Sequence, residues 1–357
     1  MEIRHLISIE DVSAEWFTSL YSICRDMIDH PGDFSGICNG KLMASLFFEP
    51  STRTNFSFQS AMMRLGGNVF GFSDPSATSR AKGESLADTI RMCAAYADTI
   101  VIRSPLEGAA KAASLYSAIP IINAGDGGHM HPTQTLTDLT TICQRRGEIR
   151  GFNIGLCGDL KNGRTVHSLA IALSKFPDIR FTLISPRDLA MPEYLLTYLK
   201  DHGQNYVEVT NLEAAMPHLD VLYMTRVQRE RFADPLEYER LKNVYILTAK
   251  KLERAKKELL VMHPLPRCEE IAMDVDADPR AVYFDQARYG MFIRMALLLK
   301  MTHMARETPP PTASHKGSQR CKNPACVTGQ ELYLPILEKT NGENISCAYC
   351  DGKLLTI

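Results

Sequence analysis

The residues Ser51-Thr52-Arg53-Thr54 place three hydroxyl groups and a guanidinium in one short segment. An apolar run over 41–48 comes before them and predicts a buried strand, and the pattern after them predicts an amphipathic helix over 54–65. The segment is therefore a turn that opens a helix, where backbone N–H groups point outward and the helix dipole favours an anion. We expect a phosphate cradle. The alternative is an N-capping turn with a surface arginine.

Further polar residues follow other predicted strands. In open α/β sheets, ligands bind outside the carboxyl ends of the strands, so these residues are expected to line a cleft between two domains. They are Arg103 after 99–103, His131 and Gln134 after 119–123, Arg164 after 152–159, Arg226 after 220–224, and His263-Pro264-Leu265-Pro266-Arg267 after 259–262.

The chemistry of these groups indicates anionic ligands. Arg53 and Arg103 could neutralise a phosphate, and Arg164 and Arg226 could bind carboxylates, although a surface salt bridge is the common alternative for each arginine. His131 could donate to a carbonyl oxygen or simply start a helix. No Ser-His-Asp spacing, Walker sequence or Rossmann glycine fingerprint is present. Catalysis would then rest on positioning and electrostatics, without a covalent intermediate or a catalytic cofactor.

Short apolar runs alternate with helical patterns along most of the chain. This alternation predicts an α/β protein with two doubly wound parallel-sheet domains. Further strands are predicted at 68–72, 180–185, 206–209, 244–248 and 282–284. Helices are predicted at 84–96, 107–117, 132–146, 164–175, 191–202, 211–217, 235–241, 250–257 and 286–304.

Bulk properties limit the possible partners. The 357 residues suffice for two ordinary domains and a small appendage, and the net charge of −1 gives no support for nucleic-acid or membrane binding. The N-terminus carries charge and no apolar signal core, and no apolar run approaches a membrane span. Six scattered cysteines read as reduced thiols of a cytoplasmic protein.

The end of the chain has a different composition. A proline-rich polar stretch over 307–319 predicts a linker, and residues 320–357, here called the tail, follow it. A segment this short cannot build much of a core, so a bound zinc would supply folding free energy, while disulfides or free thiols are the alternative. The expected ligands are Cys321, Cys326, Cys347 and Cys350.

Several motifs resemble the catalytic chains of the aspartate carbamoyltransferase family, within the aspartate/ornithine carbamoyltransferase superfamily. The resemblance covers about residues 1–306. It rests on 48–54, 79–83, His131-Pro132-Thr133-Gln134, 163–168, Tyr223-Met224-Thr225-Arg226-Val227-Gln228 and 263–267. It implies a carbamoyl-phosphate domain (1–147, with the helix 286–306 packing back on it) and an aspartate domain (148–285).

The resemblance also implies roles for single residues. Carbamoyl phosphate would be held by Ser51, Thr52, Arg53, Thr54, Arg103, His131, Gln134 and the carbonyls of Leu265 and Pro266. Aspartate would be held by Ser79, Lys82, Arg164, Arg226 and Gln228. The catalytic groups would be Arg53, Thr54, Lys82, Arg103 and His131. Another amino acid such as ornithine is the alternative substrate, and an inactive scaffold with a zinc interaction module is the rival from another class.

The assembly is implied in the same way. The loop with Ser79 and Lys82 resembles one that enters the neighbouring subunit's site, which implies a homotrimer with shared active sites in pyrimidine biosynthesis. This loop is one residue short of the family pattern, so Arg80 is the alternative to Lys82. The tail resembles the zinc domain of the family's regulatory chain, fused here without that chain's nucleotide-binding domain. A higher assembly through the tail stays open.

Overall fold

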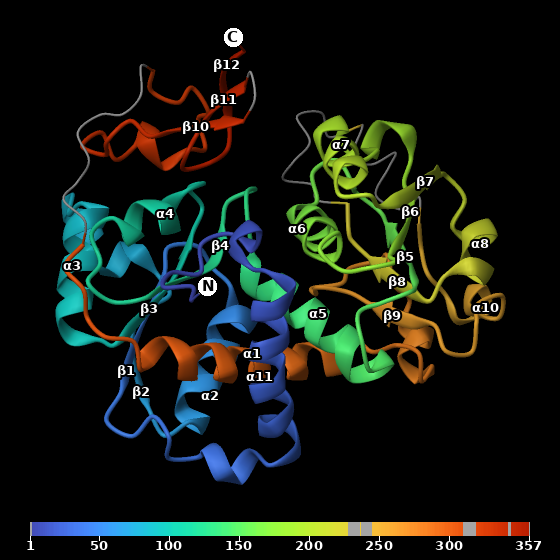
Figure 1. Ribbon diagram of the computed structural model, residues 1–357, viewed down its shortest axis with the longest axis horizontal. Helices are drawn as coiled ribbons and strands as arrows, with labels where there is room; N and C mark the ends of the chain where they lie inside the picture. Colours follow the sequence, from blue (N-terminus) through green and yellow to red (C-terminus); the bar gives the residue numbers. More distant parts are fainter. Residues whose placement is uncertain (1, 228–235, 237–244, 310–318, 342–343, 357) are drawn as a thin grey trace. The chain divides into compact units, whose positions relative to one another are not determined.

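The computed structural model describes residues 2–227, 236, 245–309, 319–341 and 344–356. The chain forms two compact units (Figure 1). Unit 1 contains residues 1–12, 16–133 and 291–357, and unit 2 contains residues 13–15 and 134–290. Among the described residues, no helix combines the length and apolar character needed to cross a membrane.

Unit 1 is built on a four-stranded parallel sheet in the order β2-β1-β3-β4. This order brings the end of β1 next to the end of β3, with Phe47 opposite Arg103. The strands are β1 (Leu42–Phe47), β2 (Asn68–Phe72), β3 (Thr99–Ser104) and β4 (Ile121–Asp126). The helices are α1 (Ala14–Asp29), α2 (Thr52–Arg64), α3 (Leu86–Tyr96) and α4 (Ala109–Ser114).

The alternation of side chains along the strands gives this sheet two covered faces. Ala44 and Leu46 of β1 point toward the core formed with α3 and α4. Ser45 points to the opposite face, where its hydroxyl donates to Asn55 Oδ1 of α2 at 2.9 Å. Both faces are buried, as expected for a parallel sheet with crossover helices. Because both faces are covered, the carboxyl ends of the strands are the part of the sheet where a ligand can bind.

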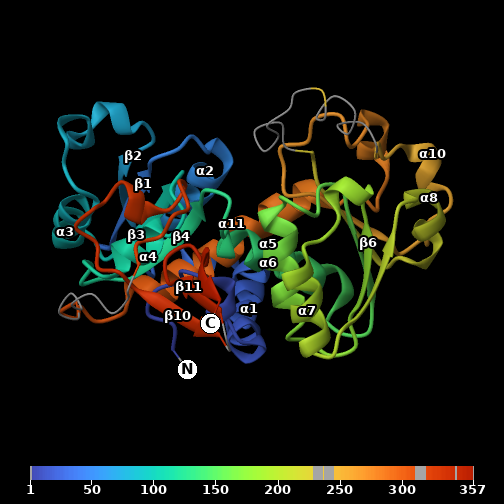
Figure 2. The same cartoon turned by 90° about the horizontal axis from the view of Figure 1, so that it is seen from above.

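Unit 2 is built on a five-stranded parallel sheet in the order β7-β6-β5-β8-β9. Helices α6 and α7 lie on one side of β6, and α8 and α10 lie on the other (Figure 2). The strands are β5 (Asn153–Cys157), β6 (Arg180–Ile184), β7 (Asn205–Val209), β8 (Val221–Met224) and β9 (Leu260–Met262). The helices are α6 (Arg164–Leu173), α7 (Glu193–Asp201), α8 (Leu212–Ala215) and α10 (Ala249–Leu252).

Two helices run from one unit into the other. They are α5 (Pro132–Arg146) and α11 (Tyr283–Thr302). In unit 1, the second half of α11 packs beside α2, since Arg294 donates to the Ser57 hydroxyl at 3.0 Å and stacks over the Phe58 ring at 5.2 Å. The predicted α/β fold with two parallel sheets is confirmed.

Some predicted elements differ from the structure. The strand predicted over 282–284 is wrong, because α11 begins at Tyr283 and only Ala281 forms an isolated bridge, with Val261. Of the strand predicted over 244–248, only Leu247 forms a bridge, with Ile271, and residue 244 lies outside the described residues. Most of the helix predicted over 235–241 also lies outside them. The predictions do not include α1 or the tail strands.

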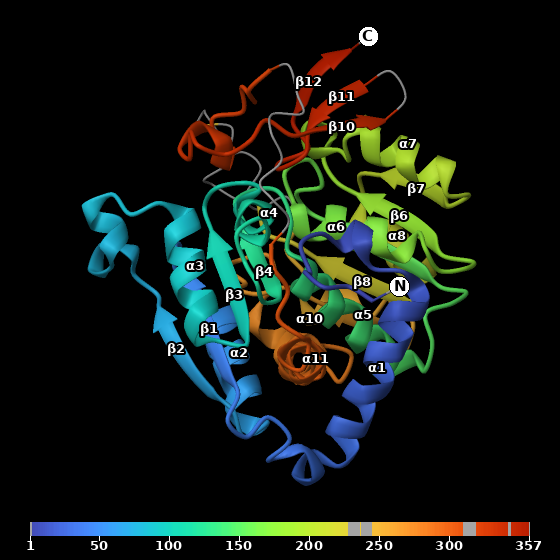
Figure 3. The same ribbon diagram turned by 60° about the vertical axis from the view of Figure 1, so that its left-hand side comes forward.

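The tail forms a small antiparallel sheet in the order β10-β11-β12, with the strands side by side in Figure 3. The strands are β10 (Glu338–Asn341), β11 (Asn344–Cys347) and β12 (Lys353–Thr356). Its buried residues, among them Val327, Leu334 and Tyr349, belong to the same hydrophobic cluster as the alanines of α4. The tail is therefore part of unit 1. Most of the predicted linker lies outside the described residues.

Candidate active site and candidate metal centre

The segment Ser51 to Thr54 joins β1 to α2, as the sequence predicts. Ser51 is the N-cap residue of α2, yet its side chain makes no capping hydrogen bond to the helix. This argues against a simple capping turn. Thr52 and Arg53 are exposed, and Thr54 is half-buried. The first N–H groups of a helix have no partner within it, so this turn offers backbone donors, hydroxyls and a guanidinium to one anion.

Arg103 lies beside this turn because β1 and β3 are neighbours. The backbone N–H of Phe48 donates to the Arg103 carbonyl at 2.8 Å. The Arg103 side chain is mostly buried and forms an ion pair with Glu49, with 2.5 Å between Nη2 and Oε1. Its Nη1 also donates to the carbonyl of Ala124 at 3.2 Å. A cationic side chain is thus fixed at the edge of the cradle.

His131 reaches the same region from β4. It is buried, precedes the first residue of α5, and lies 3.5 Å from the Thr133 hydroxyl through Nδ1. Gly125 lies next to both His131 and Arg103. A Cβ at this glycine would lie 2.9 Å from Arg103 Nη1 and 3.4 Å from His131 Cδ2. Gly125 also has φ of +121°, which a side chain would strain. The structure therefore groups the cradle, Arg103 and His131, and adds Gly125.

In unit 2, a buried carboxylate fixes Gln134. Asp138 accepts from Gln134 Nε2 at 2.8 Å, from Gln286 Nε2 at 2.7 Å and from the Tyr223 hydroxyl at 3.0 Å. Burial, with the nearby charge of Asp138, raises the pKa of Tyr223 well above its usual range, so the hydroxyl keeps its proton. Three donors satisfy a carboxylate that is otherwise costly to bury. The network holds Gln134 in one orientation.

The same network reaches the loop with Leu265 and Pro266. Gln286 Oε1 accepts from the backbone N–H of His263 at 3.0 Å, and His263 Nδ1 accepts from the N–H of Leu265 at 2.8 Å. His263 is itself buried, with Nε2 2.8 Å from Glu270 Oε1. The Leu265–Pro266 peptide bond is cis, and Leu265 has a positive φ of 51°. The hydrogen bonds through Gln286 and His263 hold the backbone of this loop.

The two arginines expected to bind carboxylates follow adjacent strands of unit 2. Arg164 is the first residue of α6, after β5, and Arg226 comes two residues after β8; both are half-buried. The loop after β5 packs closely on the end of β8, since a Cβ at Gly158 would lie 2.4 Å from the Thr225 carbonyl oxygen. The structure thus places both arginines at one sheet edge. Gln228 lies outside the described residues.

The loop expected to carry Ser79 and Lys82 is the 3₁₀ helix η4 (Ser79–Lys82) in unit 1. Both side chains are exposed, and among the described residues no hydrogen bond or ion pair is found for the Lys82 ammonium. Arg80, the alternative to Lys82, is half-buried and forms an ion pair with Glu331 of the tail at 2.7 Å. Lys82 is thus exposed, whereas Arg80 is paired with the tail.

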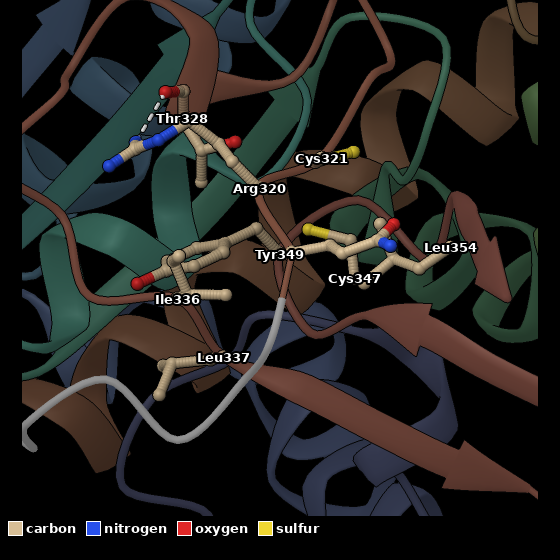
Figure 4. Close-up of a pocket in the computed structure, with 9 residues that line it drawn as sticks. Arg320, Cys321, Thr328, Ile336, Leu337, Cys347, Tyr349 and Leu354 are labelled. Atoms are coloured by element: carbon tan, nitrogen blue, oxygen red, sulfur yellow. Dashed lines mark hydrogen bonds between the residues drawn. The ribbon is translucent and has the colours of Figure 1, made fainter.

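The four tail cysteines come together as one cluster. Their sulfur atoms lie within 4.8 Å of one another, with 3.6 Å between Cys321 and Cys350 and 3.9 Å between Cys326 and Cys347. Tetrahedral thiolates about 2.3 Å from zinc would be roughly 3.8 Å apart, so the cluster fits this metal. All four cysteines are free. Ile336, Tyr349 and Leu354 line a small cavity beside Cys321 and Cys347 (Figure 4).

Direct contacts hold the tail on the rest of unit 1. The backbone N–H of Glu107 donates to the Ala325 carbonyl at 2.8 Å, and the Glu107 carbonyl accepts from the Val327 N–H at 2.9 Å. Asn323 Nδ2 donates to Glu107 Oε2 at 2.7 Å, and His129 Nε2 lies 2.8 Å from Asp351 Oδ2. Gly108 makes room for the tail, because a Cβ there would lie 2.5 Å from the Tyr349 Cβ.

Comparison with known proteins places the chain in a family. Residues 4–144 match the model of the carbamoyl-phosphate-binding domain of aspartate/ornithine carbamoyltransferases, and residues 150–301 match that of their aspartate/ornithine-binding domain. The chain belongs to the aspartate/ornithine carbamoyltransferase family. Both matched ranges end before the tail.

Relatives with curated names are catalytic subunits of aspartate carbamoyltransferase. The one from Clostridium perfringens is 54% identical over 299 residues, which cover 84% of this chain and 97% of the relative. The one from Finegoldia magna is 53% identical over 298 residues, again 84% and 97%.

Solved structures agree with this. The catalytic subunit of M. jannaschii aspartate transcarbamoylase has a TM-score of 0.79 and 47% identity, covering 84% of this chain and 98% of its own. The Trypanosoma cruzi aspartate transcarbamoylase, solved with carbamoyl phosphate and aspartate, has a TM-score of 0.79 and 40% identity, covering 84% and 96%.

Proposed function

We propose that the chain is an aspartate carbamoyltransferase, which transfers the carbamoyl group of carbamoyl phosphate to L-aspartate in pyrimidine biosynthesis. The products are N-carbamoyl-L-aspartate and phosphate. The observation that carries the proposal is the grouping of the 51–54 turn with Arg103 and His131 at the ends of β1, β3 and β4. The relatives named above support aspartate as the acceptor.

In this reaction the amine nitrogen of aspartate bonds to the carbonyl carbon of carbamoyl phosphate. The bond from that carbon to the phosphate oxygen then breaks, and the amine proton leaves with the phosphate. Ser51, Thr52, Arg53, Thr54 and Arg103 hold the phosphate and stabilise its growing charge. Thr54, Arg103 and His131 donate to the carbonyl oxygen as it becomes an oxyanion. No covalent enzyme intermediate and no catalytic cofactor are needed.

Orientation of the substrates completes the mechanism. Gln134, held by Asp138, and the carbonyls of Leu265 and Pro266 orient the carbamoyl amide. Arg164, Arg226 and Gln228 bind the two carboxylates of aspartate, and arginine suits this because its planar fork pairs with carboxylates in two parallel hydrogen bonds. Two guanidinium groups at one sheet edge would repel the extra ammonium of ornithine.

The loop of Ser79 and Lys82 is assigned to the active site of a neighbouring subunit in a homotrimer. The exposure of both side chains supports this. Mixing an Arg53→Ala chain with a Lys82→Ala chain should recover activity in hybrid trimers, because some sites then combine an intact cradle with an intact loop. Sites built from a single chain would recover nothing.

The tail is assigned as a structural zinc module, similar to the zinc domain of the family's regulatory chain and fused here to the catalytic part. The sulfur spacing in the cysteine cluster supports zinc. Zinc would hold the tail folded. The ten free cysteines support a reducing compartment, the cytoplasm.

The test of the proposed function is phosphate release by the purified full-length chain. Release should require both carbamoyl phosphate and L-aspartate, and mass spectrometry should find N-carbamoyl-aspartate in equal amount. Release that does not depend on aspartate would contradict the proposal.

A further inference from the structure

A buried carboxylate of the tail lies against the loop that carries Ser79 and Lys82. Glu331 has a side-chain exposure of 6%, and its Oε1 lies 2.7 Å from Arg80 Nη1. Its second oxygen, Oε2, accepts from the backbone N–H of Leu86 at 3.2 Å. Leu86 is the first residue of α3, where the helix dipole favours a negative charge. One side chain thus ties η4 and the start of α3 to the tail.

A second tail residue strengthens this attachment. The Tyr333 hydroxyl accepts from the backbone N–H of Ala87 at 2.9 Å, and its ring packs edge-on against Tyr116 with 5.9 Å between centroids. The segment 331–333 therefore satisfies two backbone donors of the first turn of α3, which have no partner within the helix. The tail therefore holds the segment that leads from η4 into α3 at the C-terminal end of that segment.

Arg80 in turn connects this attachment to the phosphate cradle. Its Nη1 donates to the Glu84 carbonyl at 2.8 Å, which closes the loop on itself. Its guanidinium lies over the Phe48 ring, 5.7 Å from the centroid, and Phe48 directly follows β1, the strand that leads into the cradle. Arg80 is thus held by Glu331 on the tail side and by Phe48 on the cradle side. The neighbouring Ser79 and Lys82 stay exposed.

We propose that Glu331 is a positioning residue for carbamoyl transfer: by holding Arg80, the tail sets the conformation of η4 and so the place of Lys82. The inference rests on the proposed function, in which Lys82 binds aspartate. Glu331 touches no substrate and acts through Arg80 and the loop. The tail is then more than a folded appendage, because a charge in it sets how the loop binds aspartate in the neighbouring subunit's site.

Glu331→Gln is the most direct test. Glutamine keeps the volume and an acceptor for the Leu86 N–H but removes the charge that holds Arg80. The KM for aspartate should rise roughly tenfold, as expected for loss of one charge-assisted hydrogen bond, while the KM for carbamoyl phosphate stays within about twofold. Glu338→Gln makes the same chemical change on β10, away from the loop, and should leave both KM values unchanged. An unchanged KM for aspartate in Glu331→Gln would overturn the inference.

Two further variants separate positioning from tail stability. Arg80→Gln breaks the ion pair from the loop side with the tail sequence intact, and it should raise the KM for aspartate to a similar extent. In a Lys82→Ala background, Glu331→Gln should have no further effect on this KM. A full additional rise in that background would show that Glu331 does not act through Lys82.

A measurement that does not depend on enzyme activity distinguishes failure of this inference from failure of the proposed function. Amide hydrogen exchange over residues 79–87 should be faster in Glu331→Gln than in the wild type, while zinc content and exchange over β11 stay the same. Unchanged exchange in the loop would overturn the inference, whatever the activity. A wild-type chain that fails to carbamoylate aspartate, but shows the faster exchange in the variant, would overturn the proposed function alone.

Discussion

Arg103 and Glu49 form an ion pair at the entrance to α2, with 2.5 Å between Nη2 and Oε1. Phe47, two residues before Glu49, is the register partner of Arg103 across β1 and β3. The arginine expected to bind phosphate is thus paired with a carboxylate. Glu49 therefore competes with a bound phosphate for this guanidinium.

Glu49→Gln should therefore tighten the binding of inorganic phosphate. The variant removes a negative charge that competes for Arg103 and repels the anion, so the Kd should fall severalfold, an effect of about 1 kcal/mol. Isothermal titration with phosphate measures it directly. Glu10→Gln, a carboxylate in the same unit outside the cradle, should leave the Kd unchanged. A Kd that is unchanged or higher in Glu49→Gln would contradict the competition.

Arg53→Ala should lower turnover by roughly 10²-fold or more, the scale for losing one preorganised electrostatic donor. The reason is its position in the first turn of α2, where its charge would stabilise the leaving phosphate. Steady-state kinetics with saturating substrates gives the number. Arg64→Ala, at the other end of the same helix, is the matched control. Near-normal turnover in a folded Arg53→Ala chain would contradict this role.

The positions of most candidate residues follow from local patterns. The apolar runs that became β1, β3, β5 and β8 are short, and polar residues lie at or shortly after their ends, so the strand ends and the residues after them are predictable. The segment 281–284 is apolar too, and a short apolar run fits a strand or a buried helix equally well. That ambiguity explains why the sequence predicts a strand where the structure has the start of α11. Helix α1 has a regular apolar face that includes Trp16 and Leu20, so it could have been predicted.

Contacts between distant segments could not be predicted in this way. The pair of Arg103 and Glu49 depends on the register of β1 against β3. Glu331 lies 245 residues from Leu86 along the chain, and nothing in either local sequence indicates that they meet. The close approach of Tyr349 needs Gly108, whose φ of +81° and missing side chain are visible only in the fold.

The tail should bind about one zinc per chain, with the cysteine cluster as the ligands. Replacing Cys347 and Cys350 by Ser should release the metal and unfold the tail, because the cluster and the tail core share these residues. Metal analysis of the purified chain measures the zinc, and sizing in solution reports the assembly. Cys268→Ser, an exposed cysteine in unit 2, should keep its zinc. Full zinc content in the double variant would contradict the assignment.

His129 should make the attachment of the tail depend on pH. Burial opposes its charged form, but hydrogen bonds and charges from Asp126 and Asp351 outweigh it and raise the pKa from 6.5 to about 10. Lys339 also bonds Asp351, at 2.7 Å. A histidine whose folded-state pKa is raised stabilises the fold fully below the unfolded pKa, and this contribution is lost as the pH rises through the folded value.

The melting temperatures of the wild type and of His129→Gln should therefore converge between pH 6.5 and 10. His5→Gln is the matched control, because burial lowers the pKa of His5 to about 4 and this histidine stays neutral across the range. The difference in melting temperature between His5→Gln and the wild type should be constant across this pH range. A constant difference for His129→Gln as well would show that His129 is not charged at this contact.

The central claim is carbamoyl transfer to aspartate, and kcat/KM for a panel of amino acids tests it most directly. The full-length chain is assayed with saturating carbamoyl phosphate and with L-aspartate, L-glutamate, L-asparagine and L-ornithine in turn. We predict that L-aspartate is preferred over each of the others by at least about 10²-fold, because two arginines are then matched by two carboxylates at the right spacing. A preference for ornithine, or no transfer to aspartate at all, would contradict the account.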